Sequence, residues 1–217
     1  MGDLKGVAAA ILLFPGICGC AHLVTSPPSD TIVPASSSPE ASIPADAEGS
    51  FVNAGVRPPP GFTDFCRRLS EQCVAPGNAP RSVVLTADTL QTIRLVNIAM
   101  NRAIHPEEDI DHYGRAEFWT IPIDGYGDCD DYVLVKRKAL LNLGFPEPAL
   151  RIAEVFTPRF VRHEVLVVST DKANYVLDNL KDDVTTWDET DYAWLKWQDP
   201  DSPSGWTSPH ENRISRY

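Results

Sequence analysis

Three residues of this chain have the side chains, and the order along the sequence, of a thiol-based acyl-transfer site. Cys129 supplies a thiol, His163 an imidazole and Asp178 a carboxylate. A thiol becomes a strong nucleophile when a general base lies within hydrogen-bonding reach, and that base needs a third group to orient it. The chemistry expected of such a set is attack on a carbonyl carbon, with a thioester as the intermediate.

Cys129 is expected at the start of a helix over residues 129–143. Asp128 suits the N-cap position, and a glycine follows the apolar pattern where the helix should stop. The partial positive charge of a helix N-terminus favours a thiolate. The carboxylates of Asp128, Asp130 and Asp131 oppose that effect. Either a cation or an imidazolium offsets them, or Cys129 is only a small buried hydrophobic residue.

The pairing of two predicted strands brings His163 and Asp178 together. Residues 163–169 and 174–179 have the alternation of half-buried strands and are joined by a four-residue turn. An even-length turn makes Val165 face Asp178, so His163 lies on the same face as a diagonal neighbour of Asp178. An odd-length turn would separate them. An ionisable pair on an apolar face is costly unless its members satisfy each other, which makes the pair a functional candidate.

Other elements must position these residues. Thr86 is a suitable N-cap for a helix over residues 87–104, and Asn97 is an unusual polar residue on its apolar face. A buried asparagine either satisfies nearby backbone groups or belongs to an active site, and both interpretations stay open. A further strand is expected over residues 151–156. The chain therefore predicts an α+β fold with helices packed on an antiparallel sheet.

The N-terminus has the pattern of an export signal. In residues 1–21, Lys5 precedes an apolar segment that is too short to span a bilayer. Cleavage after Ala21 and lipid modification at Cys20 both fit this segment, and an apolar N-terminus that is simply part of the fold is a third interpretation. We therefore expect a periplasmic or otherwise exported protein, which is attached to a membrane only if Cys20 carries a lipid.

Composition divides the rest of the chain. Residues 22–60 are rich in Ser, Pro and Ala and cannot bury enough apolar surface to fold, so we expect a disordered linker there. A single domain over residues 61–200 and a C-terminal tail over residues 201–217 complete the predicted organisation. This 217-residue chain has 30 acidic and 19 basic residues. Such a balance argues against nucleic acid as a partner, because phosphates need clustered Lys and Arg.

Two cysteines near the start of the domain are predicted to form a disulfide. Cys66 and Cys73 would meet an oxidising compartment in an exported protein. Seven residues of continuous helix would separate the Cα atoms by about 10 Å, whereas a disulfide needs roughly 4.4–6.8 Å. The helix that begins near Asp64 must therefore break at residues 69–70.

Acidic segments raise the question of a metal. Residues 105–114 look like a solvated acidic loop, with a metal site as the alternative. Residues 124–131 fail the calcium-loop pattern of an EF-hand, because their acids and glycines lie at the wrong offsets. From spacing alone, no closed calcium loop is predicted.

Taken together, the motifs resemble those of the bacterial transglutaminase-like cysteine peptidases, a group of LapG-like periplasmic proteases within the broader transglutaminase/papain-like superfamily. The resemblance covers roughly residues 61–197. The segments that carry it are Phe65-Cys66-Arg67 with Cys73, Val96-Asn97, Phe118-Trp119, Gly127-Asp128-Cys129-Asp130-Asp131-Tyr132, Arg162-His163 with Val165-Leu166, and Val176-Leu177-Asp178-Asn179-Leu180.

The resemblance implies a role for each candidate residue. Cys129 would be the nucleophile, His163 the base that later protonates the leaving amine, and Asp178 the group that orients the imidazole. Acids beside the catalytic cysteine are associated with calcium in this branch. That association maps onto Asp128 and Asp130, although Glu is often found where this chain has Asp130.

The function implied is that of an exported cysteine peptidase that hydrolyses a peptide bond in a cell-envelope protein, such as a surface adhesin. Two alternatives stay open. An amine, rather than water, would resolve the same thioester in an amide-transferring enzyme. A catalytically inactive binding module of the envelope would keep the fold without turnover.

Overall fold

The structure is a computed structural model that describes residues 56–74 and 77–208. The predicted signal at residues 1–21, the lipidation site Cys20 and almost all of the predicted linker lie outside the described residues, as does the end of the predicted tail. The boundaries proposed for the linker, domain and tail stay predictions, although residues 202–207 of the predicted tail form a strand of the sheet. Within the described part, no helix has the length and apolar character needed to cross a bilayer.

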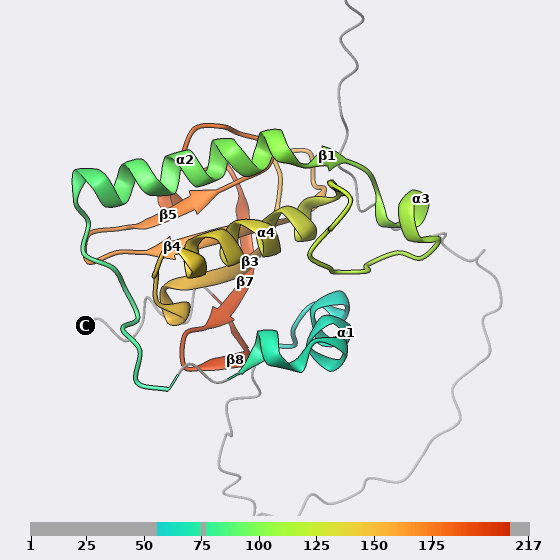
Figure 1. The fold of residues 1–217 in the computed structure, drawn as a ribbon, viewed down its shortest axis with the longest axis horizontal. Helices are drawn as coiled ribbons and strands as arrows, with labels where there is room; N and C mark the ends of the chain where they lie inside the picture. The colour runs from blue at the N-terminus through green and yellow to red at the C-terminus, as the bar shows by residue number, and fades with distance from the viewer. Residues whose placement is uncertain (1–55, 75–76, 209–217) are drawn as a thin grey trace, which may run out of the picture.

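Helices and strands alternate along the chain in the first half, and strands dominate the second half (Figure 1). The α-helices are α1 (Pro60–Arg68), α2 (Ala87–Ala103), α3 (Asp109–Tyr113) and α4 (Cys129–Asn142). Short 3-10 helices lie at Ser70–Cys73, Glu147–Ala149 and Trp187–Glu189. The strands are β1 (His105–Pro106), β2 (Tyr126–Gly127), β3 (Leu150–Phe156), β4 (Arg162–Ser169), β5 (Asn174–Leu177), β6 (Thr185–Thr186), β7 (Ala193–Asp199) and β8 (Ser202–Thr207).

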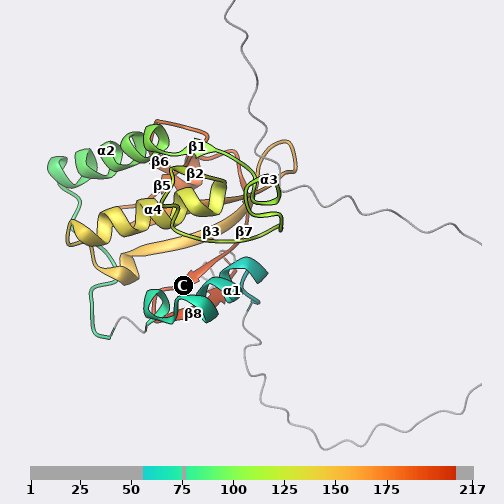
Figure 2. The ribbon, with the colours of Figure 1, turned by 45° about the vertical axis from the view of Figure 1, so that its right-hand side comes forward.

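Six of the strands form one antiparallel sheet, in the order β6-β5-β4-β3-β7-β8, and β1 pairs with β2 in parallel. Helices α2 and α4 lie side by side over the sheet, and α1 lies next to β8 (Figures 1 and 2). The Phe62 ring of α1 meets the Trp206 ring of β8 at 5.4 Å between centroids. The predicted α+β fold, with helices packed on an antiparallel sheet, is confirmed.

The two faces of the sheet bury separate apolar clusters. Even-numbered residues of β4, such as Leu166, pack with the helices, and odd-numbered residues, such as Val165 and Val167, pack against aromatic residues on the other face. This alternation follows from the pleat of a strand.

The β4–β5 hairpin has the predicted register. Val167 pairs with Val176 and Ser169 pairs with Asn174, which leaves a four-residue turn between the strands. In that turn, Thr170 N donates to Ala173 O at 3.0 Å. Strand β5 ends at Leu177, so Asp178 follows the last paired residue directly.

The disulfide between Cys66 and Cys73 is present, with 5.6 Å between the Cα atoms. Helix α1 ends at Arg68 and a 3-10 helix begins at Ser70. The helix thus breaks at Leu69, where the spacing of the two cysteines required it. The bridge holds α1 and the following turn together beside the apolar cluster that includes Phe62.

One expectation for the acidic segment is wrong. Residues 105–114 are not a solvated loop throughout, because they contain β1 and α3, and Asp109 is buried. The Asp109 carboxylate accepts the backbone N–H of Phe118. Pairing of β1 with β2 also brings this segment to the start of α4, since Glu107 N donates to Gly127 O at 3.1 Å.

Candidate active site

His163 and Asp178 form a buried pair at the beginning of β4. The Nε2 atom of His163 lies 2.8 Å from Oδ1 of Asp178, and the side chains are 1 % and 3 % exposed. Burial alone would raise the pKa of Asp178. The hydrogen bond and charge of His163, together with a hydrogen bond from Tyr192, outweigh burial and lower the pKa. Asp178 is therefore an ionised partner for the imidazole.

Three further groups fix the position of Asp178. Tyr192 donates from Oη to Oδ2 of Asp178 at 2.5 Å, and Leu180 N donates to Oδ1 at 2.9 Å. The backbone N–H of Asp178 donates to Oδ1 of Asn97 at 3.0 Å. The Tyr192 ring also meets the His163 ring edge to face, with 5.9 Å between centroids. Sequence reasoning missed Tyr192, because it comes from the distant segment before β7.

Asn97 connects helix α2 to the loop that carries Asp178. Its Nδ2 donates to the carbonyl oxygens of Lys181 and Asp182 at 2.8 and 3.1 Å. One turn further along α2, Asn101 Nδ2 donates to the carbonyl oxygen of Asp178 at 3.0 Å. Asn97 thus satisfies backbone groups, and those groups belong to the loop after β5. The structure supports the first interpretation of Asn97, and a role in an active site stays a prediction.

Cys129 begins helix α4 and is completely buried. Its Sγ donates a hydrogen bond to Oε2 of Glu164 at 3.1 Å. Burial raises the pKa of Glu164 to about 7, although the hydrogen bond from Cys129 opposes the shift. Glu164 follows His163 directly in β4, so the imidazole and the partner of the thiol belong to consecutive residues. Sequence reasoning missed Glu164, although the alternation of side chains along β4 predicts that it faces the helices.

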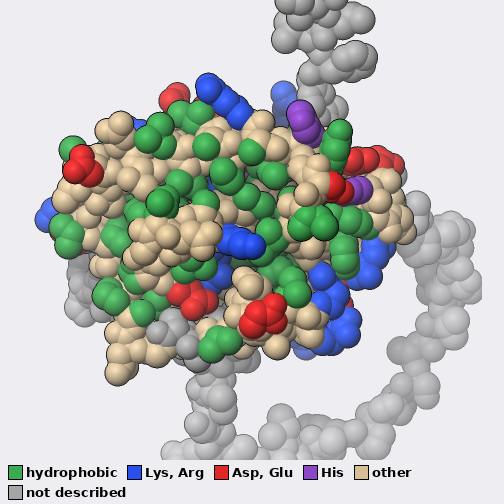
Figure 3. Space-filling model, in the orientation of Figure 1, with side chains coloured by type: hydrophobic (Ala, Val, Ile, Leu, Met, Phe, Trp, Pro, Cys, Tyr) green, Lys and Arg blue, Asp and Glu red, His purple; other side chains and the backbone are tan. Residues whose placement is uncertain are grey.

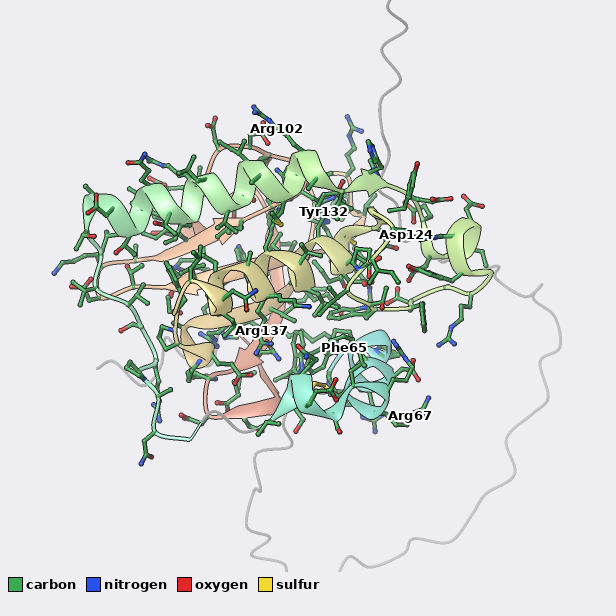
Figure 4. The ribbon with its side chains drawn as sticks, viewed as in Figure 1. Phe65, Arg67, Arg102, Asp124, Tyr132 and Arg137 are labelled. Carbon is green, nitrogen blue, oxygen red and sulfur yellow. A yellow bond between two sulfur atoms is a disulfide. The ribbon has the colours of Figure 1, made fainter. Side chains whose placement is uncertain are left out.

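Close packing shapes the start of α4. A Cβ at Gly127 would lie 2.5 Å from Oδ2 of Asp131, so only glycine fits there. Tyr132, which Figure 4 labels, donates from Oη to Ile104 O at 2.6 Å and ties this turn to the end of α2. Asp128 occupies the predicted N-cap position, but its side chain makes no capping hydrogen bond. Instead, Asp128 Oδ2 accepts the backbone N–H of Asp109 at 3.4 Å.

Three buried carboxylates gather beside Cys129. Asp109, Asp128 and Asp130 each offer one oxygen, and these oxygens lie within 4.8 Å of one another. Burial, followed by the charges of Asp128 and Asp131, holds the pKa of Asp130 well above its usual range. The sequence indicated Asp128 and Asp130. It did not indicate Asp109, because α3 reaches the cluster only through tertiary packing against the start of α4.

Asp131 lies next to these carboxylates but has a different partner. Its Oδ1 accepts the backbone N–H of Thr120 at 2.8 Å. Burial raises the pKa of Asp131 to about 7, although this hydrogen bond opposes the shift. Asp131 thus anchors the loop that crosses the start of α4.

The other described histidines lie away from the buried pair. The histidine side chains visible in purple in Figure 3 are at the end of the molecule formed by β1 and α3. His112 Nε2 contacts Oδ2 of Asp124 at 2.9 Å, and His105 is exposed. His163 is therefore the described histidine that is buried in the sheet beside a carboxylate.

A charged residue is also buried further along α4. Lys136 is 1 % exposed, about two turns after Cys129. Burial lowers the pKa of its ammonium group to about 7, although the charges of Asp178 and Asp182 act in the opposite direction. Its Nζ lies 5.7 Å from the centroid of the Tyr132 ring. The interior next to the Asp178 loop therefore contains an amine that resists protonation.

Comparisons with known proteins give matches of two kinds. The model of the family described as bacterial transglutaminase-like cysteine proteinase BTLCP matches residues 52–213, well over half of the chain. A comparison with curated proteins gives no match.

The solved structures that resemble the chain include three of LapG from Legionella pneumophila. The calcium-bound form is 22% identical, with a TM-score of 0.44, and the match covers 51% of this chain and 68% of that one. The EGTA-treated form is also 22% identical, with a TM-score of 0.44 and coverages of 52% and 64%. A third LapG structure is 20% identical, with a TM-score of 0.47 and coverages of 59% and 78%.

Replacing Asn97 should reduce stability more than replacing Asn101. Asn97→Ala leaves the buried N–H of Asp178 and two carbonyl groups without their partner, so we expect the free energy of unfolding to fall by about 2 kcal/mol. Asn101→Ala is the matched control, because two of its three hydrogen bonds are exposed. Urea denaturation measures both. Equal losses for the two variants would contradict the buried anchoring role of Asn97.

Lys136 should destabilise the fold near neutral pH. Between pH 7 and about 10.4 the unfolded chain holds a proton on this amine that the folded chain lacks, so the contribution of Lys136 to stability rises with pH. Lys136→Met should therefore raise the free energy of unfolding at pH 7 by about 1 kcal/mol or more, with a smaller gain at pH 10. Urea denaturation at both values measures this. The exposed Lys138→Met is the control, and an identical pH trend in both variants would contradict the assignment.

Proposed function

Because the chain belongs to the family of bacterial transglutaminase-like cysteine proteinases, and is thus a cysteine peptidase with a transglutaminase-like α+β fold, we propose that Cys129, His163 and Asp178 are its catalytic triad. The observation that carries this proposal is the 2.8 Å contact between His163 Nε2 and Asp178 Oδ1. The residue after His163 contacts the Cys129 thiol. The proposed base thus immediately precedes, in β4, the residue that contacts the proposed nucleophile.

We infer a role for each nitrogen of His163 from its contact with Asp178, because an ionised carboxylate only accepts hydrogen bonds. Nε2 donates to Asp178, so Nδ1 is the nitrogen that takes the proton of Cys129. The thiolate attacks the carbonyl carbon of the substrate, and the S–C bond forms as the carbonyl electron pair moves to oxygen. Collapse of this intermediate breaks the C–N bond, and the leaving nitrogen takes the proton from His163. Water, activated by His163, then hydrolyses the thioester.

The substrate proposed is a cell-envelope protein, and the family resemblance suggests a surface adhesin. Export to the periplasm is proposed from the sequence pattern of residues 1–21, with acylation of Cys20 as the route to a membrane anchor. An amide-transferring enzyme would use the same triad and the same thioester. The two reactions differ in the group that attacks the thioester.

We also propose that Asp109, Asp128 and Asp130 bind calcium. Calcium prefers carboxylate and other oxygen ligands, and these three side chains converge. The Oδ1 atoms of Asp109 and Asp130 are buried and accept no hydrogen bond from the described residues, which fits a cation. A bound cation would neutralise the negative charge that opposes a thiolate at Cys129. LapG of Legionella pneumophila has been solved in a calcium-bound form.

Cys129→Ala should abolish proteolysis, because it removes the nucleophile. We would incubate purified wild-type and variant protein with a bacterial envelope-protein extract and identify new N-termini by mass spectrometry. His163→Ala should lose cleavage as well, whereas His105→Ala, the exposed matched control, should keep it. Cleavage by Cys129→Ala would contradict the triad. In a parallel reaction we would add the amine dansylcadaverine. Its incorporation into protein without new N-termini would instead indicate amide transfer.

Calcium should raise the melting temperature through Asp109. At a free calcium concentration of about 100 times Kd, binding would add about 2.7 kcal/mol to stability. Asp109→Asn should remove most of this gain, whereas Asp111→Asn, an exposed change on the same helix, should retain it. Differential scanning calorimetry with EGTA or calcium chloride measures the shift. An equal calcium response in wild type and Asp109→Asn would contradict this site.

A further inference from the structure

Glu164 touches the reacting atom, yet the triad mechanism gives it no role. Its Oε2 accepts the hydrogen bond of the Cys129 thiol at 3.1 Å, and the residue is 3 % exposed. Strand β4 fixes this position, because Glu164 shares the helix-facing side with Leu166. A carboxylic group in contact with the nucleophile must affect any intermediate that forms there.

Titratable groups from three neighbouring parts of the chain surround Glu164. Helix α4 contributes Cys129 and Asp130, the loop after α3 contributes Glu117, and β3 contributes Glu154 directly across the sheet. Its neighbour in β4 is His163. Among these groups, the imidazole is the one that can become positive.

Glu154 already has its own partners. Its Oε1 lies 3.2 Å from Arg162 Nη1, and its Oε2 lies 3.3 Å from Lys196 Nζ. The basic side chains on this part of the sheet therefore compensate Glu154. Glu164 has the Cys129 thiol as its hydrogen-bond donor. Such a buried setting favours the neutral acid, in agreement with its pKa of about 7.

We propose that Glu164, as a neutral carboxylic acid, is a catalytic residue that donates a hydrogen bond to the oxyanion formed when Cys129 attacks the substrate carbonyl. This inference rests on the proposed peptidase function and deepens it. The oxyanion forms on the carbon bonded to Sγ, so a group that contacts Sγ is within reach of that oxygen. A carboxylate there would repel the oxyanion, whereas an O–H stabilises it. Other enzymes keep a buried carboxylic acid neutral for the same purpose.

All the protons that move in this step come from Cys129, His163 and Glu164, so no further reactant is needed. Before attack, the Cys129 S–H donates to Glu164 Oε2. His163 takes that proton, the S–C bond forms, and the carbonyl electron pair moves to oxygen. The Glu164 hydroxyl then turns its hydrogen toward this oxygen and retains it. When the leaving group departs, the carbonyl re-forms and the hydrogen bond weakens.

The experiment compares Glu164→Gln with Glu164→Ala by the release of p-nitrophenolate from p-nitrophenyl acetate, in saturating calcium, from pH 5.5 to 8.5. This ester needs no protonation of its leaving group, so its rate does not depend on proton donation by His163 to a leaving group. Glutamine donates an N–H at every pH. Glu164→Gln should keep the wild-type rate within about threefold at pH 6, and it should lack the fall in rate that wild type shows as Glu164 ionises.

Glu164→Ala should lower kcat by about 10²-fold with little change in KM, as expected for loss of one oxyanion donor. Glu154→Gln is the matched control, because it removes a buried carboxylate from the same sheet face without touching Cys129. Its pH profile should follow that of wild type. The Cys129→Ala protein gives the uncatalysed blank.

Two results would overturn the role of Glu164. A Glu164→Gln rate as low as that of Glu164→Ala would show that the carboxylate acts as an acceptor. A wild-type rate in Glu164→Ala would show that the group is not used. If Glu164→Ala does not fold, the pH profile of Glu164→Gln decides alone, because retention of the wild-type fall would contradict the proposal. Activity in Cys129→Ala would instead contradict the proposed function itself.

Discussion

The 2.8 Å contact between His163 and Asp178 exists only because β4 and β5 pair in one register. A shift by one residue would place His163 and Asp178 on opposite faces of the sheet. The structure fixes this register from both sides. The four-residue turn closes the hairpin, and Asn97 binds the loop that follows β5. Two distant parts of the chain thus hold Asp178 in place: helix α2 through Asn97, and the segment before β7 through Tyr192.

A second constraint is the number of buried carboxylates at Asp178 and near Cys129, each of which needs compensation. Asp178 is compensated by His163 and Tyr192, and Asp131 accepts a backbone N–H from the loop before β2. Calcium at the acidic cluster and a neutral Glu164 are the proposed solutions for the others. The two proposals belong together, because a thiolate beside uncompensated carboxylates would be disfavoured.

The parts that local rules govern were predictable from sequence. Alternation and turn length gave the hairpin register, and the spacing of Cys66 and Cys73 required the helix break at Leu69. Helix α2 begins after Thr86, which accepts the N–H of Thr89 as an N-cap. Asp109 and Tyr192 were missed, because their positions depend on long-range packing that periodicity does not encode. Lys136 is buried although its residue type usually lies at the surface.

Cys129 is proposed to form an acyl intermediate with His163 as its base. The most direct measurement is acid quenching of the protein within seconds of mixing with p-nitrophenyl acetate, followed by peptide mass spectrometry. We expect one acetyl group on the peptide that contains Cys129, and a much slower appearance of that adduct in His163→Ala. An acetyl group on another residue, or an adduct that forms at the same rate without His163, would contradict it.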